Sequence, residues 1–157
     1  MKAFGEGFDM YGLWLHQISG LTDAKIRRLY EFCSSAKELY EQTEQTIRTK
    51  MNLEESLSEQ IIESRKTWNL EKEWVDLQMK GISFVCLDDE NYPKKLRNLY
   101  APPFGIYVKG RLPDSNKKSV AIVGARECSA YGSQMAKKLG EALAKAGVLV
   151  ISGLARG

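Results

Sequence analysis

Apolar residues in the first eighty positions recur every three or four residues, which is the period of an amphipathic helix. The clearest stripe consists of Ile26, Leu29, Tyr30 and Cys33, and the Thr22 hydroxyl stands where it can cap the helix that carries them. The pattern predicts helices over residues 10–17, 23–32 and 58–80, and a short helix that starts at Ser34 or Ser35. Gly81 is expected to end the last helix. Residues 1–80 therefore read as a small helical module.

The period changes to two after Gly81, and β-branched and aromatic residues predict strands over 82–87 and 104–110. Between these strands, Pro93 can open a short helix that reaches Leu99. Together they form the beginning of a second domain, which we place at residues 81–157.

Two apolar runs, 119–124 and 148–153, flank a helix predicted over 131–146. This order describes a βαβ unit, the building block of a doubly wound parallel sheet, with both strands expected to be buried on both faces. The apolar stripe expected to be buried on the helix consists of Tyr131, Met135, Leu139, Ala142, Leu143 and Ala146. The predicted fold class is α/β, a helical module followed by the start of a Rossmann-like sheet.

The chain has 157 residues, of which 43% are hydrophobic, so it can bury a core. No run approaches the roughly 20 uncharged apolar residues that span a bilayer, and the N-terminus lacks the apolar region of a signal peptide. These features predict a cytoplasmic protein without a membrane partner. Cys33, Cys86, Cys128 and the single His16 show no metal-ligand spacing, so we expect structural thiols, no metal and no cofactor.

Charge divides the chain unevenly. Residues 1–80 carry 11 Lys and Arg against 14 Asp and Glu, a net of −3, whereas residues 81–157 carry 12 against 6, a net of +6. From Asn91 onward the count is 12 against 3. Such asymmetry is typical of a second part that meets a polyanion, although a solvated basic face would look the same.

Two loops follow the predicted parallel strands and are expected at the edge of the sheet where ligands bind. Gly124 in the first loop lets a ligand approach the backbone, and Arg126 supplies a guanidinium fork that matches a phosphate. Ser152, Gly153 and Arg156 repeat this combination in the second loop. The helix after the first loop also offers free N–H groups to an anion. The pair of loops predicts a double phosphate cradle.

Other nucleotide sites fit the residues less well. The stretch 124–132 lacks the second close-approach glycine of a dinucleotide fingerprint, and residues 142–157 contain no Asp or Glu to bind a ribose. No GxxxxGK[ST] sequence of a P-loop occurs. A remaining alternative is that Gly124 and Gly153 serve only as turn glycines beside solvated arginines.

Four motifs occur in a fixed order after Gly81: D-x-x-Y-P-x-x-L from Asp89, P-P-x-x-x-Y-x-x-G from Pro102, V-G-x-R-x-x-S-x-Y-G from Val123, and SGLARG from Ser152. On these motifs, residues 81–157 resemble the DNA-processing protein A family (DprA, also called Smf). Residues 10–80 resemble more loosely the helical N-terminal module of that family, which is related to sterile-alpha-motif (SAM) and helix-hairpin-helix folds.

The resemblance implies a protein that binds single-stranded DNA and catalyses no reaction. Family proteins protect incoming strands during natural transformation (the uptake of DNA by competent cells), load the RecA recombinase on them and form homodimers. On this pattern Gly124, Arg126, Ser152, Gly153 and Arg156 would line the path of the DNA phosphates. The family pattern continues past SGLARG into further strands and a dimerisation surface, so we expect residues 81–157 to be the first part of a truncated Rossmann-like domain.

Different classes of function remain as alternatives. One is a Rossmann-like protein that binds a small nucleotide or hydrolyses a nucleoside phosphate, and another is a non-functional fragment. A third assigns the function to the helical region 10–80 as a partner-binding module. A DNA-binding helix-hairpin-helix prefers two glycines in its turn, whereas this chain has Gly20 and then Thr22. With its negative net charge, the module is expected to contact protein rather than DNA.

Overall fold

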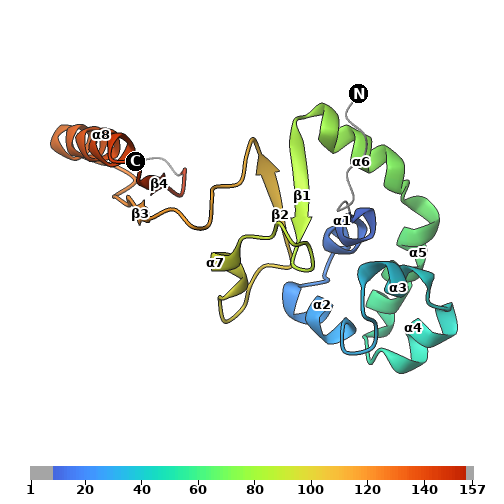
Figure 1. The fold of residues 1–157 in the computed structure, drawn as a ribbon. Coiled ribbons are helices and arrows are strands. Elements are labelled where there is room, and N and C mark those ends of the chain that lie inside the picture. The colour runs from blue at the N-terminus through green and yellow to red at the C-terminus, as the bar shows by residue number, and fades with distance from the viewer. Residues whose placement is uncertain (1–8, 155–157) are drawn as a thin grey trace. The chain divides into compact units, whose positions relative to one another are not determined.

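A computed structural model describes residues 9–154, and the chain divides into two compact units, Met1–Leu112 and Pro113–Gly157 (Figure 1). The elements of the first unit are α1 (Met10–Gln17), α2 (Asp23–Leu29), α3 (Ala36–Glu41), α4 (Glu44–Lys50), α5 (Glu55–Thr67), α6 (Leu70–Met79), β1 (Ile82–Cys86), α7 (Lys94–Arg97) and β2 (Gly105–Lys109). Those of the second are β3 (Ser119–Ala121), α8 (Ala130–Lys145) and β4 (Leu149–Ile151).

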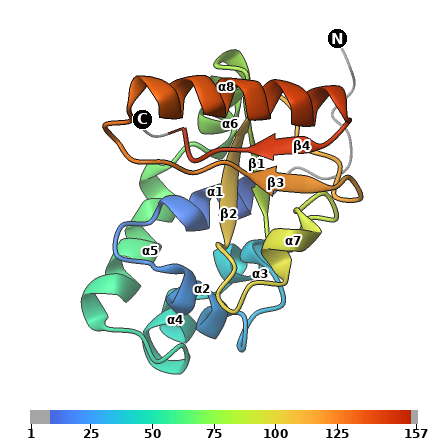
Figure 2. The same cartoon turned by 90° about the vertical axis from the view of Figure 1, so that its left-hand side faces the viewer.

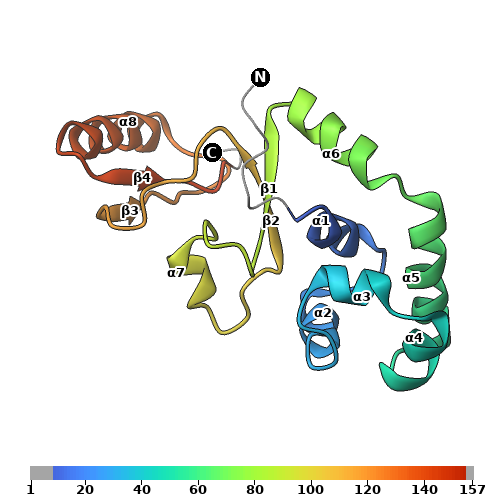
Figure 3. The same cartoon turned by 45° about the vertical axis from the view of Figure 1, so that its right-hand side comes forward.

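Helix α1 lies at the centre of the first unit, among the other helices and the β1–β2 hairpin (Figure 3). Its residues Leu13, Trp14 and Leu15 are at most 1% exposed. The Trp14 indole Nε1 donates a hydrogen bond of 2.8 Å to Ser64 Oγ on α5, so its polar atom is satisfied inside the core. Tyr40 of α3 packs edge-on against the Trp14 ring at a centroid distance of 5.0 Å. The helix is therefore covered from several sides.

The predicted helix over 58–80 is wrong as a single element. Trp68 has extended backbone angles that end α5, and the Asn69 side chain then accepts a hydrogen bond from Lys72 N at 3.0 Å and starts α6. A short polar side chain that bonds its own backbone favours a cap over a helix interior, which is why the chain breaks here. Helix α4, capped by Thr43, was not predicted either. The Thr22 cap and the left-handed Gly81 (φ +66°) are confirmed.

The strands β1 and β2 pair antiparallel, from Ile82 opposite Lys109 to Cys86 opposite Gly105. One face of this hairpin contributes Phe84 and Cys86 to the helical core, and Val85 and Val108 join Tyr92 in a smaller core. Strand side chains alternate between faces, so both faces of the hairpin are used. The hairpin belongs to the same compact unit as the helices, which extends to Leu112. The division into domains at residue 80 stays a prediction.

The second unit is the predicted βαβ unit. Strands β3 and β4 pair parallel, with Val120 opposite Val150, and α8 connects them and lies along the pair (Figure 2). The expected burial is wrong, because no residue of α8 is buried and Tyr131, Leu139 and Ile151 are 71%, 51% and 48% exposed. One helix on two short strands provides a single contact surface, so neither the second face of the sheet nor most of the helix is covered.

None of the helices within residues 9–154 is long and apolar enough to cross a lipid bilayer.

Gly105 gives a sharp test of the hairpin packing. A Cβ at this position would overlap the ring of Phe84, which is 4% exposed. We expect Gly105→Ala to lower the free energy of unfolding by about 1–3 kcal/mol, because overpacking forces the ring from its position. Urea unfolding read by tryptophan fluorescence measures this, since all three tryptophans (Trp14, Trp68, Trp74) lie in the first unit.

The Phe84→Leu variant provides the control for that test. If the ring causes the loss, Phe84→Leu will cost less in the Gly105→Ala background than alone, which a double-mutant cycle measures. Strictly additive losses would contradict the predicted overlap.

The single histidine predicts a pH dependence of stability. His16 packs among Phe84, Phe104 and Tyr107, and burial lowers its pKa, with the nearby Asp23 carboxylate partly opposing this. The unfolded chain therefore binds a proton more readily, and the free energy of unfolding should fall as the pH decreases through about 6.5. Burial raises the pKa of Asp9, which acts in the opposite direction at lower pH.

Urea midpoints between pH 8 and pH 5.5 test this dependence against His16→Gln. That variant removes the only histidine and keeps Asp9, so its midpoint should change less across the range. Parallel curves for the two proteins would show that His16 is not responsible.

Candidate functional site

The loops that follow β3 and β4 line one cavity of about 610 Å³ in the second unit. Its lining residues come from the first loop, the beginning of α8 and the second loop: Ile122, Val123, Gly124, Ala125, Glu127, Cys128, Ser129, Gly132, Ser133, Ala136, Lys137, Ser152 and Gly153. The structure therefore brings Gly124, Ser152 and Gly153 together, at the edge of the parallel pair where the strands end.

Local hydrogen bonds position the two loops. Ile122 N donates to Ile151 O at 2.9 Å, which extends the pairing of the strands by one residue before the first loop departs. Ser129 then caps α8, because its Oγ accepts a hydrogen bond from Gly132 N at 3.1 Å. In the second loop, Leu154 N donates to Ser152 Oγ at 3.4 Å, and Leu154 adopts a left-handed conformation (φ +52°).

The beginning of α8 supplies the electrostatic character of the cavity. Ser129, Gly132 and Ser133, around the first turn of this 16-residue helix, all line the cavity, and the first turn contains no acidic residue. The positive end of the helix dipole favours an anion there, although Gly132 N and Ser133 N already donate to Ser129 Oγ and Ser129 O. Lys137, two turns into the helix, adds a positive charge, whereas Glu127 adds a negative one. The lining therefore combines the N-terminus of a helix with one positive and one negative side chain.

The two loop glycines are not required by the fold. A Cβ built on Gly124 or Gly153 would meet no atom within 4 Å, and neither residue has a positive φ. Glycine at these positions therefore relieves no internal clash or strained turn in the described part of the chain. The open space beside both backbones leaves room for a ligand to approach them closely. The same open space lies beside Gly20, Gly110 and Gly140 outside the cavity, so the binding role of Gly124 and Gly153 stays a prediction.

The arginines of the predicted cradle are placed differently. Arg126 is exposed on the first loop, two residues after Gly124, and is not among the residues that line the cavity. Arg156 lies outside the described residues. The structure thus assembles the glycines and the serine of the predicted site, and it leaves Arg126 on the surface beside it.

Sequence reasoning missed Ser129, Gly132, Ser133 and Lys137 as lining residues. Ser129 could have been found, because a serine directly before a helix is a typical N-cap. Lys137 lies outside the apolar stripe predicted for α8, and the sequence pattern alone does not indicate that it lines the cavity. Cys33 and Cys86 are buried as expected, but Cys128 is exposed and lines the cavity, so the expectation of three structural thiols is wrong for it.

Within residues 9–154, no group of three His, Cys, Asp or Glu side chains is arranged to hold a metal ion. The side chains that the cavity presents are serine hydroxyl groups, the Lys137 ammonium, the Glu127 carboxylate and the exposed Cys128 thiol.

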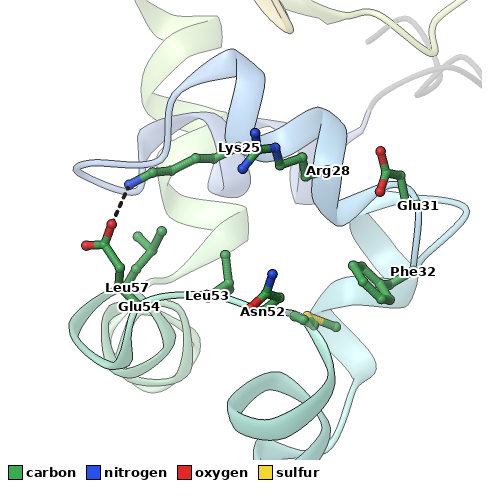
Figure 4. A pocket seen from close by; sticks show the side chains of 9 residues that line it. Lys25, Arg28, Glu31, Phe32, Asn52, Leu53, Glu54 and Leu57 are labelled. Atoms are coloured by element: carbon green, nitrogen blue, oxygen red, sulfur yellow. Dashed lines mark ion pairs between the residues drawn. The ribbon is translucent and has the colours of Figure 1, made fainter.

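A smaller cavity of about 320 Å³ lies in the helical unit, between α2 and the segment that leads into α5 (Figure 4). Lys25 Nζ and Glu54 Oε1 lie 3.9 Å apart at one end of it, and Phe32, 51% exposed, stands at the other. Arg28 and Glu31 also line it. The charged residues that line this cavity are two positive and two negative ones, so its lining is neutral overall.

Comparison with known proteins shows which family part of this chain resembles. Residues 83–157 match the sequence model of DNA recombination-mediator protein A. Protein Smf of Borreliella burgdorferi is 42% identical over 88 residues, which make up 53% of this chain and 28% of that protein. Protein Smf of Synechocystis is 28% identical over 151 residues, or 94% of this chain and 38% of that protein. This chain therefore spans well under half the length of these relatives.

A solved structure shows the same fold. The X-ray structure of DNA processing protein A (DprA) from Streptococcus pneumoniae superimposes with a TM-score of 0.65 at 23% identity. The superposition covers 96% of this chain and 51% of that chain. The mixed fold of helices and a short parallel sheet, predicted as the start of a Rossmann-like domain, is thereby confirmed.

Proposed function

Because the chain belongs, through residues 83–157, to the DNA recombination-mediator protein A family, we propose that it binds single-stranded DNA through the cavity at the β3 and β4 loops. The observation that carries this proposal is the cavity itself. It combines two glycines with open space, the Ser152 hydroxyl and the beginning of α8, which Ser129 caps. A sugar-phosphate backbone requires these features, namely close approach to the chain and N–H or O–H donors for its oxygens.

Charge supports a polyanion as the ligand. Residues 113–157 carry seven Lys and Arg against three Asp and Glu, which is a net of +4 on a unit of 45 residues. Neutralised phosphates release counterions, so each such contact strengthens binding at low salt. The exposed Arg126 would hold a phosphate at the margin of the cavity, and Arg156 would act from the second loop.

At the level of the whole protein, we propose the role that the family resemblance implies. The protein would protect incoming single strands during natural transformation, load the RecA recombinase on them and act in the cytoplasm as a homodimer. The proposed cavity binds and positions DNA and carries out no reaction on it. The names of two further relatives, the DNA processing proteins DprA of Bacillus subtilis and Streptococcus pneumoniae, support a role in DNA processing.

Arg126 tests the charge in this proposal. We expect Arg126→Ala to weaken binding of an oligothymidine by about 1–3 kcal/mol, because a charge-assisted phosphate contact is lost. The slope of log K against log salt should decrease by about one. Arg126→Lys should restore the slope but only part of the affinity, since lysine lacks the planar fork. Fluorescence anisotropy across a salt series measures both quantities, and unchanged values in Arg126→Ala would remove this residue from the site.

Gly124 tests the cavity. Gly124→Val should fill the space beside the backbone and weaken oligothymidine binding at least about tenfold, while the open surroundings leave stability nearly unchanged. Gly140→Ala in α8 is the matched control, because it also lies in open space but away from the cavity lining. Far-UV circular dichroism reports the stability of both variants. Full binding by a folded Gly124→Val protein would contradict the proposed site.

A further inference from the structure

One aromatic side chain of the first unit stands entirely in solvent. Tyr100, three residues after α7, is 104% exposed, and its neighbour Leu99 is 51% exposed. Single exposed apolar residues are common, but a tyrosine whose whole ring faces water gives up the burial that such a ring usually gains. The ring contributes nothing to the core, so its faces are free for another molecule.

The segment that carries Tyr100 is held at its beginning. Arg97 Nη2 donates to Asp89 O at 2.7 Å, and the Arg97 guanidinium lies 5.6 Å from the centre of the Tyr92 ring. Asn98 N donates to Lys94 O at 3.2 Å, and Leu99 N donates to Leu96 O at 3.1 Å. These bonds fix α7 and the turn after it on the buried Tyr92.

The segment is held at its end as well. Pro103 O accepts a hydrogen bond of 2.6 Å from the Tyr92 hydroxyl, and Phe104 N donates to Asp23 Oδ1 at 3.1 Å. Arg27 Nη1 also donates to Pro102 O at 3.5 Å. Only a few residues therefore separate two anchored points, and the proline that follows Ala101 disfavours a helical conformation there. Tyr100 is presented on a short, braced turn, which lowers the entropy that ordering it on a ligand would cost.

The charge around this turn is positive. Residues 91–104 contain Lys94, Lys95 and Arg97 and no Asp or Glu, whereas Lys109 lies at the far end of β2, opposite Ile82. Lys94 and Lys95 are exposed on α7, one to two turns before Tyr100. The acidic residues Asp88, Asp89 and Glu90 come just before this stretch, and Asp89 is occupied by hydrogen bonds to Asn91. The basic stretch of the sequence therefore begins after Glu90.

We propose that α7 and the Leu99–Tyr100 turn form a second binding surface for single-stranded DNA, with Tyr100 as a stacking platform for one base and Lys94 as a phosphate contact. Aromatic rings beside a basic track bind single strands by stacking, whereas a duplex hides the base faces from them. A protein-binding surface would instead gather several exposed apolar side chains. Among residues 91–101, Leu99 is the one large apolar residue that is exposed beside Tyr100. The inference shares its ligand with the proposed function but rests on residues of the other compact unit.

Oligothymidine binding by the whole chain tests the platform. Tyr100→Ala should weaken binding about five- to tenfold through the loss of stacking, and Tyr100→Phe, which keeps the ring, should bind like the parent protein. Lys94→Ala should reduce the salt slope by about one, whereas Lys72→Ala on the exposed surface of α6 should not change it. An oligothymidine that carries 5-iodouracil should cross-link on irradiation to the peptide that contains Tyr100, as read by mass spectrometry.

Separate outcomes decide the two proposals. If Tyr100→Ala binds like the parent while Gly124→Val is impaired, the platform is wrong and the cavity stands. If Tyr100→Ala is impaired and Gly124→Val binds fully, the cavity is wrong and the platform stands. Equal losses of single-stranded and duplex binding in Tyr100→Ala would overturn stacking. Absence of oligothymidine binding by the parent chain at low salt would overturn both.

Discussion

Three consecutive residues of α1, Leu13, Trp14 and Leu15, are almost completely buried, and consecutive positions on a helix point in different directions. Burying them all requires cover on several sides, which α3, α5, α6 and the hairpin together provide. Each such side chain contributes roughly 1.5–3 kcal/mol on burial, so the hairpin gains stability by folding onto α1. This packing ties residues 82–109 to the helices. It also explains why the 98–104 segment, bonded to Asp23 and Arg27 of α2, is braced.

The sequence pattern predicted the elements that depend on local signals. The Thr22 cap, the Gly81 helix end, the hairpin strands and the βαβ unit are confirmed because each follows from a period, a cap or a left-handed glycine. The break at Trp68 and Asn69 was missed because the apolar period continues across it, and a single asparagine cap decided the geometry. Burial in the second unit failed for a different reason. An apolar strand indicates that its faces can be buried. Whether they are buried depends on the helices that cover them.

In the candidate site, too, some residues could be placed from the sequence pattern and others only from the three-dimensional structure. Gly124, Ser152 and Gly153 could be placed together because the carboxyl ends of parallel strands meet at one edge. Their role as glycines could not be judged until the structure showed that a Cβ would be unopposed at both positions. Ser129 and Lys137 line the same cavity from α8, and their distance from the strands depends on how the helix lies, which no residue pattern specifies. Tyr100 was overlooked because exposure is a property of the assembled unit.

The two proposed surfaces bind a single strand by different physics. The cavity uses fixed donors and open backbone, so it reads the shape of a phosphate and depends on glycine at two positions. The α7 surface uses one ring and nearby charges, so it accepts any base and responds strongly to salt. A site of the first kind holds the strand in register, and a site of the second kind tolerates any sequence. A protein that must bind DNA of unknown sequence needs both properties, and the two proposals assign one to each compact unit of this chain.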